Sequence, residues 1–363
     1  MKIGILTLLD EKNYGNRWQN FAMNKLLQSK GIDTENIYIW ERNTDRSCFR
    51  EKVKRILPLR MAYLAHVISV YHINNICMLK RVLKFMIFTH KYMKSKLVLV
   101  NRGAELKNKF DVSGFDYFVV GSDQVWNPYY VSNPIFFLNF VNIDKRLAFM
   151  ASFGCDEIPK MKRKSYANWL SEMNYISVRE PSGKNIVKLL TGKEADIFLD
   201  PVLLLERDKW VSLGKKPKKF NMHNNYAVTF MFNREIDDIK KFCSENKLEL
   251  IILNSVNNKK YYALDPTEMI YVINNAKIVF TDSFHIMAIS IKLNKQFYVF
   301  QRNGFEYMFN RLKSTLERLS ITQCIYEKEM CMTPILDEQY DTVNIKLQME
   351  KERFLETVNN IIV

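Results

Sequence analysis

Apolar and polar positions near the N-terminus follow two spacings, which predict a strand, a helix and a second strand. Residues Lys2–Leu9 are mostly apolar and have the length of a buried strand. Apolar residues then recur at helical spacing through Asn16–Lys30, and Gly31 stands where a helix C-cap is expected. A second apolar segment, Ile32–Trp40, predicts another strand. This βαβ order is typical of a doubly wound sheet.

The same alternation returns twice later in the chain. In the first half, strands are expected at Phe115–Val120, Arg146–Phe153, Tyr175–Val178 and Asp196–Leu199. After a lysine-rich segment at 215–219, further strands are expected at Tyr226–Phe232, Leu248–Leu253, Ala276–Phe280 and Gln296–Phe300. We therefore predict an α/β fold with two Rossmann-like domains that face each other across a cleft.

The length of 363 residues suits two domains of about 150–200 residues each. We place the first domain at residues 1–204 and the second at residues 205–344. Within the first domain, residues 48–100 are predicted to form a basic, mostly helical insertion, which Pro58 should break or kink. A last helix within residues 345–363 is expected to cross back to the first domain.

The distribution of charge along the chain indicates an anionic partner. The net charge is +15, and residues 42–109 hold sixteen basic against three acidic residues, a net +13. Such a segment suits an anionic membrane, a phosphorylated substrate or nucleic acid. Nucleic acid ranks last, because no zinc finger, RNP-type run or clear helix-turn-helix accompanies the charge. The helices of this segment are either ordinary surface helices or a platform for a bilayer or a lipid-linked acceptor.

Cysteine usage and the first residues give the expected compartment. The six cysteines form no CxxC pair and no Cys/His cluster with zinc-ligand spacing, so no metal site is predicted. Asp10 follows the first apolar residues too early for a signal peptide, and the apolar stretch at 61–70 is too short to span a bilayer. We expect a cytoplasmic protein.

Ligands of open α/β sheets bind beyond the carboxyl ends of the strands, and two such ends in the first domain carry suitable residues. The first is Asn13–Arg17, where Gly15 lets backbone amides approach a ligand and the helix start favours an anion. The second follows the strand that ends at Val120. It holds three polar or aromatic residues that suit a carbohydrate: Ser122, Asp123 and Trp126.

Two further strand ends carry an arginine and a histidine. Arg179 precedes a helix opened by Pro181, and it either grips a phosphate or carboxylate or forms a surface ion pair. In Thr281–His285 a buried strand passes into a helix, which Asp282 or Ser283 can cap. His285 falls in the first turn of that helix, where an imidazole can exchange protons near neutral pH.

Taken in chain order, these motifs resemble the polysaccharide pyruvyl transferase family over nearly the whole chain. The motifs that carry the likeness are Asn13-Tyr14-Gly15 with Gln19, Phe115-Asp116, Gly121-Ser122-Asp123-Gln124-Val125-Trp126, Arg179-Glu180 with Ser182, Leu199-Asp200-Pro201-Val202, Thr281-Asp282-Ser283-Phe284-His285 and Asn310-Arg311. Members of that family look like GT-B glycosyltransferases. They transfer a pyruvyl group from phosphoenolpyruvate to a sugar of a cell-surface polysaccharide or its precursor, usually as a ketal.

The resemblance implies roles for individual residues. Arg179 matches the arginine that holds the donor, and His285 matches the acid/base histidine. Some members have Arg-Leu before this histidine, where this chain has Ser283-Phe284, so Arg17 or Arg311 is a candidate for the missing positive charge. The donor set is then Arg179, Ser283, Phe284, His285 and Arg311, in the second domain except for Arg179. The acceptor set in the first domain is Asn13, Gly15, Arg17, Ser122, Asp123 and Trp126, with Asp123 orienting or deprotonating a sugar hydroxyl.

The implied partners are phosphoenolpyruvate as donor substrate, a sugar acceptor that is either free or lipid-linked, and an anionic membrane reached through residues 42–109. No cofactor or metal is expected, and the predicted location is the cytoplasm, at the inner face of the membrane if the basic segment docks there. Two alternatives stay open. One is a GT-B glycosyltransferase with a nucleotide-sugar donor, and the other is a non-enzymatic basic scaffold on a membrane or a capsule-assembly complex.

Overall fold

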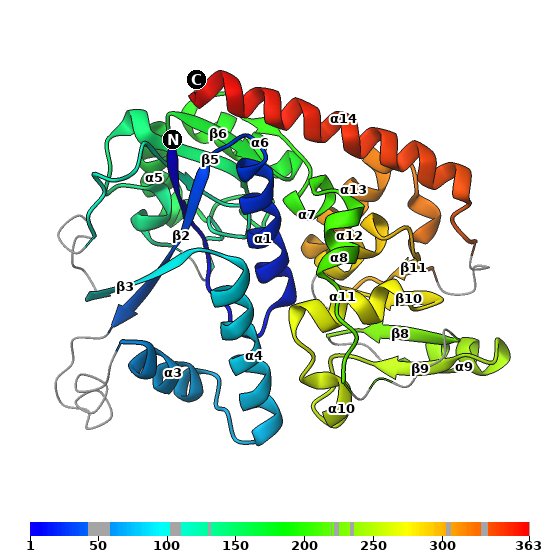
Figure 1. The fold of residues 1–363 in the computed structure, drawn as a ribbon. Helices are drawn as coiled ribbons and strands as arrows, with labels where there is room; N and C mark the ends of the chain where they lie inside the picture. Colours follow the sequence, from blue (N-terminus) through cyan, green and yellow to red (C-terminus); the bar gives the residue numbers. More distant parts are fainter. Residues whose placement is uncertain are drawn as a thin grey trace.

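Two separate parallel β-sheets organise the chain (Figure 1). The computed structural model describes residues 1–42, 59–101, 110–129, 132–218, 220, 225–232, 236–302, 306–327 and 333–362. In these ranges, seven strands form one sheet in the order β3-β2-β1-β4-β5-β6-β7, and four strands form the other in the order β11-β10-β8-β9. Every neighbouring pair is parallel. The predicted α/β fold with two Rossmann-like domains is confirmed.

The strands and helices have the following bounds. The strands are β1 Lys2–Leu6, β2 Asp33–Arg42, β3 Ser95–Asn101, β4 Tyr117–Val120, β5 Arg146–Ala151, β6 Tyr175–Val178, β7 Asp196–Ile197, β8 Tyr226–Phe230, β9 Glu249–Ile252, β10 Ile278–Thr281 and β11 Gln296–Val299. The helices are α1 Tyr14–Gln28, α3 Leu59–Val70, α4 Ile76–Tyr92, α5 Lys160–Ser171, α6 Pro181–Thr191, α7 Pro201–Leu204, α8 Arg207–Leu213, α9 Asp237–Glu245, α10 Lys259–Tyr262, α11 Pro266–Asn274, α12 Phe284–Lys292, α13 Glu306–Leu319 and α14 Asp337–Ile362. Short 3₁₀ turns lie at Pro134–Phe137, Ile143–Lys145 and Thr322–Cys324.

Both sheets reverse their winding direction at one point, and these points lie where the candidate site is found. In the first sheet the chain leaves β1 towards β2 but leaves β4 towards β5. In the second sheet it leaves β8 towards β9 but leaves β10 towards β11. The carboxyl ends of β1, β4, β8 and β10 therefore flank crevices of the kind that bind ligands in doubly wound folds.

Helix α1 connects the two halves. It belongs to the first sheet but packs against α7, α11 and α12. The Tyr14 hydroxyl donates to the Leu264 carbonyl at 2.7 Å, and the Trp18 indole donates to the Pro266 carbonyl at 3.1 Å. Both rings are buried in a hydrophobic core that includes residues of both sheets. One helix is thus part of both interiors.

The segment predicted as a helical insertion differs from that prediction at its end. Residues 95–101 form β3, which pairs with β2 at the edge of the first sheet. Helices α3 and α4 therefore belong to the crossover between two parallel strands. A short apolar run directly after a helix cannot be told from more helix by periodicity, which explains the error. Pro58 and the first part of the segment lie outside the described residues.

The C-terminal helix α14 runs along one side of the molecule past both sheets (Figure 1). Its Phe354 ring packs edge-on against Phe149 of β5 at 5.5 Å and against Phe198 at 5.4 Å. The Arg353 guanidinium caps the Ile197 carbonyl of β7. Both contacts join the end of the chain to the first domain.

Candidate functional site

The start of α1 meets the loop after β4 at a buried polar pair. Asn13 is the N-cap of α1, and its side chain accepts the Asn16 amide at 3.2 Å. The Asn16 side chain in turn donates to Asp123 Oδ2 at 2.9 Å and to the Leu8 carbonyl at 2.8 Å. Asp123 is nearly buried, so this contact fixes the direction of its carboxylate. The structure thus brings the first two predicted strand ends together.

Arg17 does not face the cleft. Its side chain is fully buried, and it binds Glu11 Oε2 at 2.5 Å and Asn16 Oδ1 at 2.6 Å. A guanidinium held this way orients Asn16 and is not available to a ligand. The prediction that Arg17 contacts the acceptor or replaces a donor arginine is therefore wrong.

Two residues predicted at the acceptor site are instead structural. Trp126 is completely buried, donates to the Phe136 carbonyl at 2.8 Å and stacks on Phe137 at 5.2 Å. Ser122 is also completely buried, and its hydroxyl donates to Gln19 Oε1 at 2.7 Å. The apolar surroundings of this loop were not visible in the sequence, so its aromatic residue looked like a sugar platform. Neither Ser122 nor Trp126 is therefore exposed to an acceptor, contrary to the prediction.

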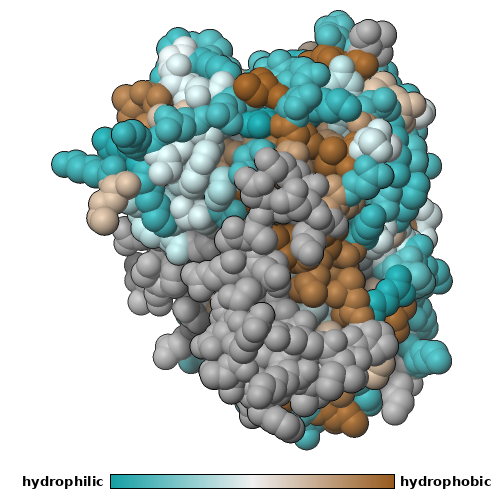
Figure 2. Space-filling view, turned by 90° about the vertical axis from the view of Figure 1, so that its left-hand side faces the viewer, coloured by the Kyte–Doolittle hydropathy of each residue, from teal (hydrophilic) through white to brown (hydrophobic). Residues whose placement is uncertain are grey.

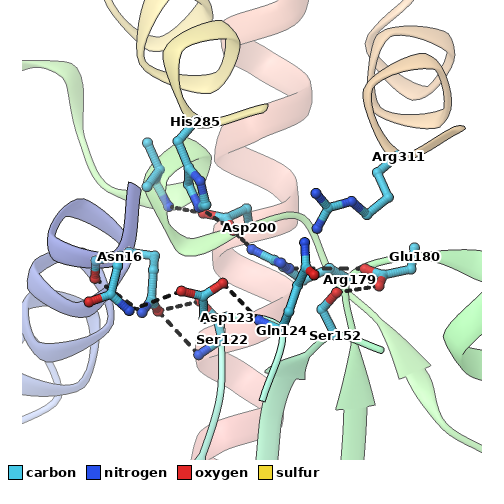
Figure 3. A network of polar contacts seen from close by, with 12 residues as sticks. Asn16, Ser122, Asp123, Gln124, Ser152, Arg179, Glu180, Asp200, His285 and Arg311 are labelled. Atoms are coloured by element: carbon cyan, nitrogen blue, oxygen red, sulfur yellow. Dashed lines mark hydrogen bonds and ion pairs between the residues drawn. The ribbon is translucent and has the colours of Figure 1, made fainter. Parts of the chain in front are cut away.

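Arg179, Asp200 and His285 lie next to one another where the two domains meet (Figure 3). Arg179 Nη1 donates to Asp200 Oδ2, and His285 Nε2 lies 3.6 Å from the same oxygen. Asp200 caps the short helix α7 by accepting the Val202 amide at 2.9 Å. Two hydrogen bonds therefore fix the carboxylate, and it lies between the arginine of the first domain and the histidine of the second, whose buried Nε2 has no hydrogen-bond partner among the described residues.

The protonation states of these groups follow from their contacts. Burial alone would raise the pKa of Asp200, but the Arg179 guanidinium, with help from His285, holds that pKa well below its ordinary value. Burial alone would lower the pKa of Arg179, but Asp200, Glu180 and Asp123 together raise it. The site therefore contains a permanent ion pair. Arg179 Nη2 is buried and has no hydrogen-bond partner among the described residues, so this guanidinium keeps an unused donor.

Gly15 is packed against the imidazole of His285. A Cβ atom at residue 15 would lie 2.0 Å from His285 Nδ1 and 2.2 Å from Cγ, so no side chain fits there. The first turn of α1 thus forms the wall against which the histidine ring is seated. The sequence predicted that Gly15 lets backbone amides approach a ligand, whereas the group that approaches Gly15 in this structure is the His285 ring.

The first turn of α12 has no side-chain cap. Ser283 is the N-cap residue, but its side chain makes no capping hydrogen bond. Asp282 instead accepts the Phe232 amide at 3.1 Å and the Arg302 guanidinium at 3.3 Å. The helix start therefore keeps its partial positive charge next to His285, which suits an anion.

Two guanidiniums lie near the ring of Phe284. Arg179 and Arg311 each lie 5.5 Å from the centre of its ring, measured from Cζ. Arg311 comes from α13 and points towards the Arg179–Asp200 pair (Figure 3). Arg311 therefore supplies a second positive charge near His285. This charge comes from α13 and not from the start of α12, where Ser283 stands.

A cavity of about 260 Å³ opens on the other side of His285. It lies between the β1–α1 loop, α4 and the carboxyl end of β8. Its walls include the predicted residues Asn13, Gly15, Ser283 and His285. Arg179, Phe284 and Arg311 instead surround a much smaller pocket with Glu180 and Asp200. Phe284 and His285 therefore separate two compartments.

Several residues of this site were not predicted. Asp200 stood in a quoted motif, and its place before Pro201 at the end of a strand was the available signal. Asn16 lay within a chosen segment but was not singled out. Arg81 on α4 reaches the cavity from a helix whose charge suggested only a surface role. Among the described residues, no group of three His, Cys, Asp or Glu side chains is arranged to hold a metal.

Two Rossmann-like sheets that face each other across this polar cleft define a GT-B-like protein, as the fold prediction stated. The sequence model of one family, described as polysaccharide pyruvyl transferase, matches residues 13–304. The chain belongs to the polysaccharide pyruvyl transferase family. The predicted class of enzyme, a transferase, is confirmed at this level.

Solved structures share the fold at low identity. A Staphylococcus aureus MnaA structure with UDP has a TM-score of 0.51 and 11% identity, and the match covers 99% of this chain and 96% of that one. The UDP-GlcNAc 2-epimerase of Methanocaldococcus jannaschii has a TM-score of 0.48 and 11% identity, covering 99% and 100%. The UDP-GlcNAc 2-epimerase of Neisseria meningitidis, bound to UDP-GlcNAc, has a TM-score of 0.45 and 10% identity, and the match covers 99% of this chain and 100% of that one. No curated protein matches the sequence significantly.

Proposed function

We propose that the protein transfers the pyruvyl group of phosphoenolpyruvate to a sugar of a surface polysaccharide or its precursor and forms a pyruvate ketal. The observation that carries this proposal is the buried Arg179–Asp200–His285 cluster at the meeting point of the two domains. Family membership supports the transferase class. The donor, the ketal product and the roles below are part of the proposal.

The donor has a carboxylate and a phosphate, so it needs cations and helix-end amides. Arg179, which keeps a free Nη2, and Arg311 supply the cations beside Phe284. The start of α12 supplies amides with partial positive charge. For the donor to lie here, the small pocket around Arg179 and Arg311 must widen, because it is tight in this structure.

The proposed reaction has two steps, and inorganic phosphate leaves in the second. A proton adds to the methylene carbon of phosphoenolpyruvate while a sugar hydroxyl attacks the adjacent carbon and loses its proton. A second hydroxyl then displaces inorganic phosphate from that carbon, which closes the ketal. We assign proton transfer to His285, which Asp200 and Gly15 hold in place. Asp123, oriented by Asn16, is assigned to an acceptor hydroxyl.

Incubation of the purified protein with phosphoenolpyruvate and candidate sugar acceptors tests the proposal. We expect release of inorganic phosphate and a product heavier by one pyruvate ketal. His285→Ala should reduce turnover by about 10²-fold or more, because general acid–base catalysis contributes on that scale. His90→Ala, at an exposed histidine of α4, is the matched control and should keep full activity. Undiminished transfer by His285→Ala would remove His285 from the mechanism.

A thermal unfolding measurement distinguishes phosphoenolpyruvate from the alternative donor, a nucleotide sugar. The similar S. aureus structure contains UDP, and the shared fold is compatible with a nucleotide-sugar donor. Thermal stabilisation of the protein by nucleotide sugars but not by phosphoenolpyruvate would favour the glycosyltransferase.

We further propose that α3 and α4 contact an anionic membrane, where a lipid-linked acceptor would lie. Residues 59–92 contain no Asp or Glu. Large apolar side chains are exposed on both helices: Leu59, Met61, Val70, Ile76, Leu83 and Ile87. Exposed cations lie among them: Arg60, Lys80 and Lys91. Apolar groups with interspersed cations suit an anionic interface.

Figure 2, which faces the side that lies on the left in Figure 1, shows hydrophobic residues in a band right of its centre. Among the described residues, no helix is long and apolar enough to cross a bilayer.

Vesicle sedimentation tests this contact. The wild-type protein should bind vesicles that contain anionic lipid and release them at high salt. Ile76→Glu combined with Ile87→Glu should weaken binding about tenfold or more, since each change removes apolar burial and adds repulsion. Ile345→Glu, at an equally exposed position on α14, is the control. Equal binding by both variants would show that this face is not the membrane contact.

A further inference from the structure

The larger cavity beside His285 carries positive charge that the described residues do not neutralise. Arg81 is 4% exposed, yet no carboxylate of the described residues contacts its guanidinium. Nη2 donates to the Lys12 carbonyl at 2.7 Å, and Nε has no partner. The guanidinium lies between the rings of Tyr14 and Tyr262, 4.7 Å from each centre. A buried cation of this kind is stabilised only by dipoles and π faces, and it attracts an anion.

Lys12 adds a second cation to the same wall. Its ammonium donates to the Tyr71 carbonyl at 3.4 Å and lies 4.2 Å from the centre of the Tyr71 ring. Burial lowers the pKa of Lys12, Asp10 raises it, and Arg81 lowers it again. Asp10 is the one acidic residue among those that line the cavity, and it already accepts the Tyr71 hydroxyl at 3.0 Å. The described walls therefore keep a net positive charge.

Two further aromatic residues line the cavity and suit a sugar. Phe232 follows the end of β8 and is half exposed, with the Arg302 guanidinium 4.2 Å from the centre of its ring. Tyr262 of α10, which packs on Arg81, also lines the cavity but is nearly buried. Aromatic faces of this kind pack on the C–H groups of a pyranose. Asn254 adds a side-chain amide for hydroxyl groups. His285 lines the same cavity, so a sugar here would place its hydroxyls beside the proposed acid/base group.

We propose that this cavity is the acceptor subsite and that it takes a sugar bearing a phosphate ester, with the phosphate at Lys12 and Arg81 and the ring against Phe232 and Tyr262. The phosphate belongs either to a soluble sugar phosphate or to a lipid-linked sugar diphosphate. The assignment of the cavity to the acceptor rests on the proposed function, whereas the binding of a sugar phosphate does not.

Calorimetric titration in the absence of phosphoenolpyruvate tests the site directly. A hexose 1-phosphate should bind about tenfold or more tightly than the neutral methyl glycoside, the scale of one charge-assisted contact. Arg81→Met and Lys12→Met should each remove most of that preference. Lys12 is only partly buried, so its variant keeps the test valid if Arg81→Met fails to fold. Lys209→Met, at an exposed lysine of α8, is the control and should bind as the wild type does.

Kinetics and a lipid-linked arm complete the test. With phosphoenolpyruvate present, the two cavity variants should raise the KM for the acceptor about tenfold and leave the KM for phosphoenolpyruvate unchanged. A detergent-solubilised lipid-linked sugar diphosphate that binds far better than the hexose 1-phosphate would identify the lipid source.

Three results would overturn the inference: equal binding of charged and neutral sugars, unchanged binding by both variants, or a rise confined to the KM for phosphoenolpyruvate. Sugar phosphate binding that depends on Arg81, without transfer from phosphoenolpyruvate to any acceptor, would refute the proposed function alone and leave the binding site standing.

Discussion

Among single residues, Asp200 contacts both Arg179 and His285 and also caps a helix. It accepts from Arg179, lies 3.6 Å from His285 and caps α7. Its lowered pKa means that the carboxylate stays charged at neutral pH and protonates only in strong acid. The stability that it contributes is present above its ordinary pKa of about 4 and is lost as pH falls below that value.

Asp200→Asn tests the positioning role. The amide keeps the size of the side chain but loses the charge, so His285 and Arg179 lose their shared partner. We expect turnover to fall by about 10²-fold, with a shift in the pH–rate profile that Asp200→Glu partly restores. A purely structural role would instead lower the melting temperature and leave the pH profile of the folded protein unmoved.

The residue scale also marks the limit of reading the sequence. Arg179, His285 and Asp123 lie near the ends of strands, and the positions of strand ends follow from the spacing of apolar residues, so their place in the fold could be predicted. Arg17 and Trp126 stand at equally polar-looking places, but packing turns both side chains inward. Which way a loop residue faces depends on neighbours far away in the chain, and periodicity carries no such information.

At the scale of elements, the first turns of α1 and α12 meet face to face, and Gly15 is the point of contact. Gly15→Ala would ordinarily favour a helix, since glycine is the weaker helix former by roughly 0.5–1 kcal/mol. Here the new methyl would overlap His285, so we expect activity to fall by about 10²-fold, a typical cost of moving a catalytic group by about 1 Å.

Gly114→Ala supplies the comparison for this variant. No atom lies within 4 Å of a Cβ at residue 114, so that change should leave activity intact. Steady-state assays with both variants check the prediction, and full activity of Gly15→Ala would show that the ring of His285 tolerates displacement.

Elements were predicted well where strands are separated by clear turns and helices are amphipathic. The strand β3 was missed because its apolar run follows α4 almost directly, within a segment that reads as continuous helix. The face-to-face meeting of α1 and α12 could not be predicted at all. It joins residues some 270 positions apart, and only the packing of the two sheets creates it.

At the scale of the whole molecule, Lys292 lies where α12, the connection before α8 and α14 come together. Its pKa is lowered to about 8, mainly because the side chain is buried; Glu206 raises the pKa, and Lys351 of α14 lowers it. Glu206 already accepts the Lys351 ammonium. Below about pH 8 the lysine is protonated in both the folded and the unfolded protein, and the folded protein bears the full cost of burying the charge.

Lys292→Met should therefore stabilise the protein by about 1–3 kcal/mol at pH 7, since one pKa unit corresponds to about 1.4 kcal/mol. Between about pH 8 and the unfolded value of 10.5 the wild type sheds this proton on folding, so the advantage of the variant should shrink to zero. Denaturant unfolding of both proteins at several pH values measures the difference. An advantage independent of pH would mean that Lys292 has the same pKa in the folded and the unfolded protein.

Helix α1, which packs in both domains, also limits how far the two domains can separate. Spreading the domains apart would pull the Tyr14 hydroxyl from the Leu264 carbonyl and the Trp18 indole from the Pro266 carbonyl. Each of these broken bonds would leave a buried donor unmatched until water arrived, at a cost of about 1–3 kcal/mol. These two hydrogen bonds therefore oppose a spreading of the two domains.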